Sequence, residues 1–163
     1  MINGFEIVVD RERVVLEHVL LAEPSLPQAV KNLNTCIPLA GIYEGQSVGA
    51  CLMQQRDSVY DIVSLAVAPS YQGKGFSKEM LLYSLDYARV QGGKYVEIGC
   101  GNSDVMLYSL FQKAGFRVVG VWPDHYSEDS KSMVVENGII KRDMIRFRAD
   151  LRDFDRLKIT TLG

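Results

Sequence analysis

The sequence lacks the features that mark several large classes of protein. Its 18 basic and 20 acidic residues give a formal net charge of −2, without the basic excess typical of nucleic-acid-binding proteins. No apolar run approaches the roughly 18 residues of a membrane-spanning helix. The first residues also lack the long apolar block of a secretory signal. We therefore expect a cytoplasmic protein whose partners include neither nucleic acid nor membrane.

Cysteine is scarce as well. The three cysteines, Cys36, Cys51 and Cys100, lie far apart and form no CxxC pair. Disulfide frameworks use an even, dense set of cysteines, and structural zinc sites use paired ligands. The pattern supports neither, and we expect no metal.

The chain does carry enough apolar material for one good core. Hydrophobic residues make up 47% and charged residues 23% of its 163 positions, the balance of an ordinary globular protein. A chain of this length is typical of one domain. We predict a single domain over residues 1–163, with a core over about residues 5–149 and a polar tail over residues 151–163.

Hydrophobic periodicity predicts alternating strands and helices. A first helix is expected from Arg11, with Asp10 as its N-cap, and a hairpin turn is expected at Gly45-Gln46. This order indicates an α/β layered fold in which residues 60–100 form a parallel crossover. The further helices are expected at residues 27–34, 76–91 and 103–114, and the strands at residues 5–9, 39–44, 47–54, 60–68, 95–100, 118–122 and 138–147.

The loop after the 60–68 strand is the strongest local signal of a binding site. Gln72-Gly73-Lys74-Gly75 leads directly into a helix, and its glycines allow successive backbone N–H groups to point at one spot. That spot carries the positive end of the helix dipole and suits a phosphate. The alternative is a tight junction in which the glycines serve only the turn. The spacing matches no P-loop, and Lys78 stands where a dinucleotide-binding fingerprint needs a small residue.

Several motifs together resemble the GCN5-related N-acetyltransferase (GNAT) superfamily. Its acetyl-CoA signature, Gln/Arg-x-x-Gly-x-Gly/Ala, is similar to Gln72-x-x-Gly75-x-Ser77. The block that begins at Phe111, Phe-Gln-Lys-Ala-Gly-Phe, resembles the family's Tyr-x-x-x-Gly-Phe ending, and Asn102 resembles the family's Asn. The resemblance covers most of the chain from about residue 5 to 149. It implies the GNAT fold, a mixed, mostly antiparallel sheet of six to seven strands flanked by helices.

The resemblance also implies where acetyl-CoA binds. The site is a V-shaped opening between the 60–68 and 95–100 strands, with the pantetheine arm along the first strand and the pyrophosphate on the loop. Asn102 and the helix after it would line the other wall. The residues expected to bind the cofactor are Leu65, Ala66, Val67, Gln72, Gly73, Lys74, Gly75, Phe76, Ser77, Asn102 and Phe111.

Acetyl transfer to an amine needs the free base, and because an alkylamine has a pKa of about 10.4, a general base is useful. Glu97 lies five residues before Asn102, the spacing at which the ribosomal-protein N-acetyltransferases carry a catalytic Glu. The alternative is a charged residue on a half-exposed strand face. Many members of the family carry a Tyr that protonates the leaving CoA thiolate, and at that position this chain has Phe111. Tyr108, one turn earlier, is either its substitute or a packing residue.

Other reactive residues are weaker candidates. Cys100 is expected to be a small packed residue, because strand alternation turns it away from Glu97. His18 is expected in the core or lining a groove, and His125 in a solvated loop over residues 123–131. The basic residues from Lys141 to Arg156 alternate with aspartates, which indicates surface ion pairs.

The sequence therefore predicts an enzyme that moves the acetyl group of acetyl-CoA directly to a primary amine of a small molecule or a protein. The alternative function is an acyl-CoA-binding module with little or no turnover, which the missing hydroxyl at Phe111 motivates. The family resemblance mildly favours a homodimer.

Overall fold

A mixed sheet organises the part of the chain that the structure describes. The structure is a computed structural model that describes residues 2–126 and 133–154. The sheet has the strand order β1-β2-β3-β4-β5-β9-β6, in which β4 and β5 are parallel and the other neighbours antiparallel. This confirms the predicted layered fold. The strands are β1 (Phe5–Val9), β2 (Ile37–Tyr43), β3 (Gln46–Arg56), β4 (Val59–Val67), β5 (Tyr95–Gly101), β6 (Arg117–Trp122) and β9 (Met144–Asp150).

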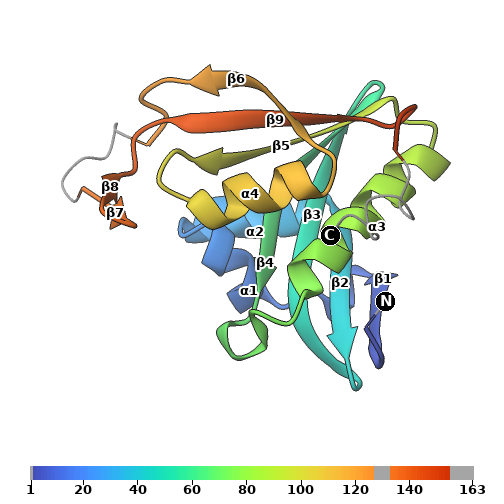
Figure 1. Cartoon of the computed structure of the whole chain (residues 1–163). Helices are drawn as coiled ribbons and strands as arrows, with labels where there is room; N and C mark the ends of the chain where they lie inside the picture. Colours follow the sequence, from blue (N-terminus) through green and yellow to red (C-terminus); the bar gives the residue numbers. More distant parts are fainter. Residues whose placement is uncertain (1, 127–132, 155–163) are drawn as a thin grey trace.

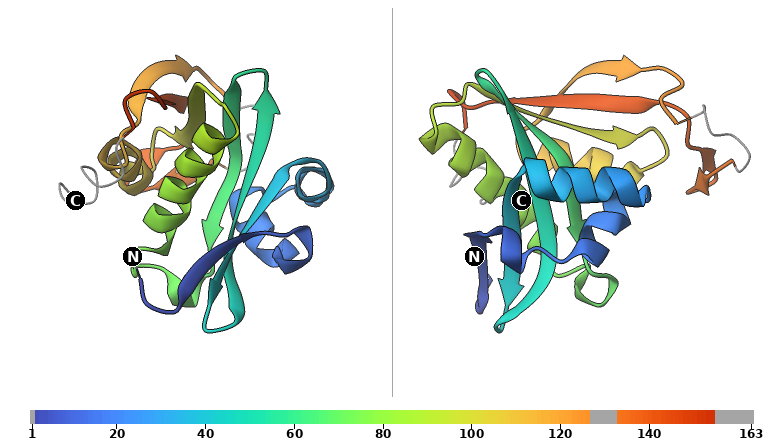
Figure 2. Two further views of the ribbon diagram at one scale, coloured as in Figure 1. Left: turned by 90° about the vertical axis from the view of Figure 1, so that its right-hand side faces the viewer. Right: turned by 180° about the vertical axis from the view of Figure 1, so that it is seen from behind.

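Helices cover both faces of this sheet. Helices α3 and α4 lie on one face, and α1 and α2 lie on the other (Figure 1 and Figure 2). The helices are α1 (Leu16–Ala22), α2 (Leu26–Thr35), α3 (Phe76–Val90) and α4 (Val105–Lys113), with short 3-10 turns η1 (Arg11–Arg13) and η2 (Pro69–Tyr71). None of the helices in the described part of the chain is long and apolar enough to cross a membrane.

Two apolar cores result from this arrangement. The larger core lies under α3 and α4 and includes Val96 of β5 and Phe147 of β9. The smaller core joins Val19 of α1 and Ala29 of α2 to Leu52 of β3. Within the described ranges, this smaller core contains no residue of β5, β6 or β9. These three strands therefore have one face that neither α1 nor α2 covers (Figure 2, right).

Helix α3 forms where the apolar spacing predicts it. All five residues of its predicted inner stripe are buried against the sheet, which fits the 3.6-residue period. They are Phe76, Met80, Leu81, Leu85 and Ala88.

The predicted first helix is wrong in its extent. The Asp10 side chain accepts a hydrogen bond from the backbone N–H of Glu12, but it caps only the 3-10 turn η1. Val14 and Val15 are extended, with ψ angles of 125° and 128°, and α1 begins only at Leu16. Val14 is also buried in the smaller core. A pair of β-branched residues loses side-chain freedom in a helix, and here the pair joins two short elements instead.

The predicted strand over residues 138–147 is also wrong as one element. Residues 135–140 form a hairpin of β7 (Val135–Glu136) and β8 (Ile139–Ile140), and β9 begins at Met144. The hairpin turns at Asn137 and Gly138, whose φ angles are 55° and 74°. The turn between β2 and β3 lies one residue earlier than predicted, because Glu44 and Gly45 both take positive φ. Residues 127–131 of the predicted loop and 155–163 of the predicted tail lie outside the described residues.

Candidate functional site

The sheet opens between β4 and β5. These strands pair only from Val59↔Tyr95 to Asp61↔Glu97, whereas β5 pairs with β9 along its whole length. A β-bulge shifts the register between β3 and β4 at Leu52/Met53, and bulges bend the strand that carries them. Beyond Asp61, the β4 edge that faces β5 therefore carries backbone N–H and C=O groups with no strand partner.

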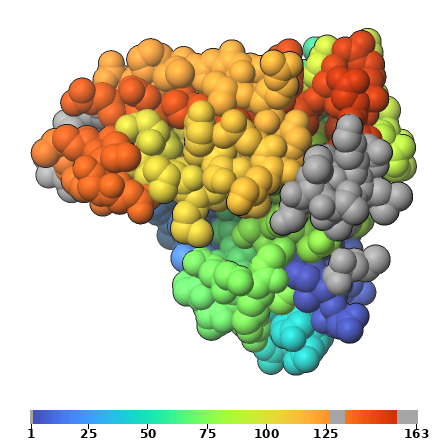
Figure 3. Space-filling model, viewed as in Figure 1, coloured from blue at the N-terminus to red at the C-terminus, as the bar shows by residue number. Residues whose placement is uncertain are grey.

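A cavity of about 770 Å³ follows this free edge. Its walls are the end of β4, the loop after it, the first turn of α3, and α4. In Figure 3 the loop, in green, lies directly below α4, in yellow. The lining residues are Leu21, Leu65, Ala66, Val67, Tyr71, Gln72, Gly73, Gly75, Phe76, Ser77, Lys78, Asp104, Val105, Met106, Leu107, Ser109, Leu110 and Lys113.

Most of the residues expected at a cofactor site line this cavity. The exceptions are Lys74, Asn102 and Phe111. The expected residues that it brings together are Leu65, Ala66, Val67, Gln72, Gly73, Gly75, Phe76 and Ser77.

The glycine loop prepares the cavity for an anion. Gly73 and Gly75 have φ angles of 78° and 88°, in the left-handed region that side chains disfavour. Gly75 is the N-cap of α3, and among the described residues no side chain caps this helix. The first-turn N–H groups of α3 are therefore free to bind a negative group at the positive end of its dipole. Lys78 and Lys113 add positive charge to the cavity wall.

Gln72 fixes the loop to the strand. Its side-chain Nε2 donates to the carbonyl oxygen of Val67 at 2.9 Å. Tyr71 supports the same turn, since its hydroxyl lies 3.3 Å from Oε1 of Gln46 and the Lys74 ammonium lies 5.4 Å from its ring centroid. The Lys74 side chain thus packs on the loop itself.

Asn102 and Phe111 serve the surrounding structure. Asn102 Nδ2 donates to the Ile140 carbonyl at 3.0 Å, and its Oδ1 accepts from the backbone N–H groups of Arg142 and Asp143. These contacts occupy the backbone N–H groups of Arg142 and Asp143, which a continuous strand would need for pairing. This explains why β9 begins only at Met144. Phe111 is 1% exposed and packs edge-on against Phe147 in the larger core.

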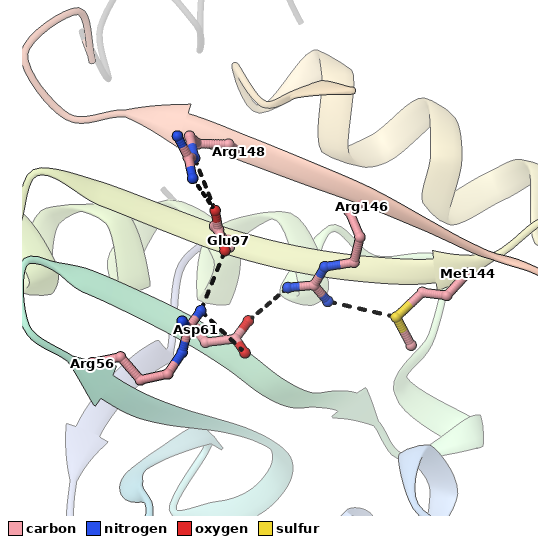
Figure 4. A network of polar contacts seen from close by, with 6 residues as sticks. All are labelled: Arg56, Asp61, Glu97, Met144, Arg146 and Arg148. Atoms are coloured by element: carbon pink, nitrogen blue, oxygen red, sulfur yellow. Dashed lines mark hydrogen bonds and ion pairs between the residues drawn. The ribbon is translucent and has the colours of Figure 1, made fainter. Parts of the chain in front are cut away.

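Glu97 lies at the vertex of the opening in a network of charges (Figure 4). Its Oε2 is 2.7 Å from Nη2 of Arg148, and its Oε1 is 3.3 Å from Nη2 of Arg56. Asp61, its register partner, is 3.0 Å from Nη2 of Arg146 and 4.0 Å from Nη2 of Arg56. Both carboxylates are less than one-fifth exposed, so the network fixes two carboxylate acceptors near the point where the strands part.

Arg146 corrects the expectation that the basic run forms only surface pairs. This residue is buried, with 8% of its surface exposed.

Two tyrosines differ in their surroundings. Tyr108 is 43% exposed, contacts the Phe147 ring edge-on and does not line the cavity. Tyr126 follows β6, and burial raises the pKa of its hydroxyl to about 12. The Lys141 ammonium lies 4.5 Å from the Tyr126 ring centroid. Periodicity alone gives no signal for Tyr126.

The three cysteines are buried, His18 is half-buried, and His125 is exposed, as expected for a loop residue. Cys36, Cys51 and Cys100 are free thiols, and burial raises the pKa of Cys100 to about 12, so it stays neutral. His18 has a buried Nδ1 with no hydrogen-bond partner among the described residues, and burial lowers its pKa. In residues 2–126 and 133–154 no group of three His, Cys, Asp or Glu is placed to hold a metal ion.

The helix after Asn102 was expected to line the other wall, and α4 does line the cavity, but the residues by which it does so were not predicted. The α4 residues Val105, Met106, Ser109 and Lys113 line it, as does Leu21 of α1. Their signal was present, because Val105 and Met106 lie outside the inner stripe of α4 and yet are apolar. They are 47% and 79% exposed. An apolar second face on a surface helix is typical of a binding surface.

Comparisons with known proteins agree with this geometry. The model of the acetyltransferase (GNAT) family matches residues 11–116. The uncharacterized N-acetyltransferase YvbK of Bacillus subtilis is 40% identical over 117 residues, which are 69% of this chain and 68% of that protein.

Two solved structures have the same fold. An acetyltransferase of Bacillus subtilis in complex with CoA is 31% identical, with a TM-score of 0.80 over 90% of this chain and 97% of that one. A GNAT family acetyltransferase from Elizabethkingia anophelis with acetyl-CoA bound has a TM-score of 0.84 at 24% identity, over 91% of this chain and 99% of that one.

Proposed function

Because this chain belongs to the acetyltransferase (GNAT) family, we propose that it binds acetyl-CoA in the cavity beside β4 and transfers the acetyl group directly to a primary amine. The observation that carries this proposal is the uncapped start of α3, which meets the free edge of β4 in one cavity. A pyrophosphate is a suitable ligand for the N-terminus of α3, and an amide-containing arm is suitable for the free edge of β4. The relative with bound CoA supports the same assignment. Use of acetyl-CoA also fits the cytoplasmic location that the composition predicts.

In the proposed reaction, the lone pair of the amine nitrogen attacks the thioester carbonyl carbon. The C–S bond breaks, CoA leaves as its thiolate, and the amine loses one proton. We propose that Glu97 accepts this proton, directly or through a water molecule, because two arginines fix its carboxylate at the vertex of the opening. A thiol with a pKa of about 8.5 leaves as a thiolate without much help. The lack of a hydroxyl at Phe111 is therefore compatible with turnover, and Tyr108 is assigned no step.

A second candidate function is an acyl-CoA-binding module with little turnover. The observation that favours it is that Phe111 is buried in the larger core. Many family members carry at this position a Tyr that acts as a general acid. This candidate predicts CoA binding without thiol release for any amine.

Thermal unfolding with acetyl-CoA, CoA, ATP and NAD tests the binding step. A ligand at a hundred times its dissociation constant stabilises the folded state by about 2.7 kcal/mol. We expect acetyl-CoA and CoA to raise the midpoint and the two nucleotides to leave it unchanged. Thiol release with a panel of primary amines then separates the two functions. A protein that ignores millimolar acetyl-CoA contradicts both.

A further inference from the structure

One face of β5, β9 and β6, which neither α1 nor α2 covers, carries a nearly buried arginine. Arg146 of β9 has Gly99 of β5 and Gly120 of β6 as its register partners. Neighbours directly opposite in antiparallel strands present their side chains on the same face. Gly99 lacks a side chain, and the guanidinium lies in the gap that this leaves over the glycine, whereas a Cβ on Gly120 would meet nothing within 4 Å.

The guanidinium is held tightly in this gap. A Cβ on Gly99 would come within 2.7 Å of Arg146 Nη1 and 2.6 Å of Met144 Sδ, so the arginine lies directly across the glycine. The ring of Trp122 lies 4.3 Å from the guanidinium carbon. The Arg146 side chain is only 10% exposed. Its orientation is therefore set before any ligand arrives.

Few of the N–H donors of the Arg146 guanidinium have strong acceptors. Nη2 donates to Oδ1 of Asp61 at 3.0 Å, and Nη1 lies 3.5 Å from the Met144 sulfur, a weak acceptor. A guanidinium has about five N–H donors, and its planar fork matches a carboxylate. The described contacts thus leave N–H donors of a buried cation for an anionic group.

The charges around Arg146 also favour an anion. Arg56, Arg146 and Arg148 surround only Asp61 and Glu97, which leaves one positive charge in excess (Figure 4). Each carboxylate already has an arginine partner. A polycationic acceptor would therefore find no unpaired acid in this network.

Arg146 does not line the cavity beside β4 but lies next to the vertex where β4 and β5 part. Asp61 and Glu97 form the last residue pair before β4 and β5 separate, and Arg146 binds Asp61. The cavity beside β4 also reaches Leu21 of α1, on the sheet face opposite α3 and α4. An amine close to Glu97 and a carboxylate on Arg146 would belong to one small molecule that carries both groups close together.

We propose that the acceptor is a free α-amino acid, whose carboxylate binds Arg146 while its amino group faces the thioester. This inference rests on the proposed function and narrows its acceptor to one class. The amino nitrogen forms a C–N bond with the acetyl carbon, the C–S bond breaks, and one proton leaves the nitrogen. The products are an N-acetyl amino acid and CoA.

The first test compares matched acceptors with the wild-type protein. Thiol release is measured for a panel of L-amino acids and for the carboxamide of each, which keeps the amine and the side chain but lacks the charge. The amide is the less basic amine and has more free base at neutral pH, so without carboxylate recognition it is the better substrate. We expect kcat/KM to be at least about tenfold higher for the preferred acid, the size of a charged hydrogen bond. Equal rates, or faster amides, overturn the inference.

The second test uses Arg146→Met and Arg146→Lys. We expect Arg146→Met to raise KM for the amino acid about tenfold or more and to lower kcat/KM for the amide far less. Arg146→Lys should recover part of the loss, because it keeps the charge without the fork. Arg152→Met is the control, since this arginine is exposed and pairs with Asp150 instead. A parallel loss for acid and amide shows a structural role and overturns the inference.

Acetyl-CoA-dependent thermal stabilisation of each variant separates folding from recognition. If Arg146→Met fails to fold, the wild-type comparison of acids with amides decides alone. Absence of both stabilisation and thiol release in the wild type would instead reject the proposed function. Turnover of amides or simple amines without preference for acids keeps the function and rejects only the amino-acid acceptor.

Discussion

The side-chain amide of Gln72 lies 2.9 Å from the carbonyl oxygen of Val67 and donates a hydrogen bond to it. This contact joins the glycine loop to the last residue of β4. The strand edge and the helix N-terminus that form the proposed cofactor site thereby keep a fixed distance from each other.

Gln72→Leu removes the donor and keeps a similar volume. A net hydrogen bond contributes about 1 kcal/mol, so we expect the dissociation constant for acetyl-CoA to rise roughly fivefold, measured by titration calorimetry. Gln91→Leu is the matched control, because Gln91 is exposed at the other end of α3. An unchanged affinity in Gln72→Leu would show that the loop needs no such tie.

Gly73→Ala tests the left-handed loop. An added Cβ meets nothing within 4 Å, so the cost is backbone strain of about 1–2 kcal/mol at a φ of 78°. We expect lower stability in urea together with weaker acetyl-CoA binding. Gly92→Ala has the same kind of strain, at a φ of 86° with open space around it, but lies after α3. It should lose similar stability and keep full affinity; equal affinity losses in both variants would contradict a loop-specific role.

Phe111→Tyr tests whether the residue typical of the family can simply be restored. Phe111 is 1% exposed and packs among aromatic rings, so a new hydroxyl would be buried without a partner. We expect a loss of about 1–3 kcal/mol in the free energy of unfolding and no gain in kcat. A faster enzyme would show that position 111 does reach the thioester sulfur. Phe116→Tyr, at another buried ring of the same core, is the control for stability alone.

His18 should make stability depend on pH. Burial lowers its pKa from the usual 6.5, so below that pH the unfolded state binds the proton more readily than the folded state does. The free energy of unfolding therefore falls as the pH drops from 7.5 through 6.5, and the loss continues down to the lowered folded-state pKa. In His18→Gln this fall should become shallower. Denaturant titrations between pH 5.5 and 7.5 compare the slopes, and parallel curves for His18→Gln and the wild type would refute the assignment.

Local patterns were sufficient to predict α3 and its loop. Glycines at both ends of an apolar stripe define the helix, and Gly73 and Gly75 adopt the positive φ that their type allows. The opening beside β4 was expected from the family resemblance alone, and no local residue pattern predicts it. It depends on the bulge at Leu52/Met53, and a bulge has no distinctive residue pattern here.

The charged network around Asp61 and Glu97 could not be predicted from the sequence either. Asp61 and Arg146 are 85 positions apart, and only the strand order β4-β5-β9 brings them together. A basic run that alternates with aspartates is usually solvated, so the burial of Arg146 over Gly99 carries no local signal.

Among the described residues, neither α1 nor α2 covers one face of β5, β9 and β6, and this has a consequence for how substrate choice can change. Met144 and Trp122 lie beside Arg146 on this face and belong to neither apolar core, so replacing these two residues empties no packed interior. New acceptor preferences can therefore be installed on this face at little cost to folding, whereas the opposite face of the same strands holds the core and tolerates far less. One side of these strands is thus constrained by acceptor recognition and the other by packing of the core.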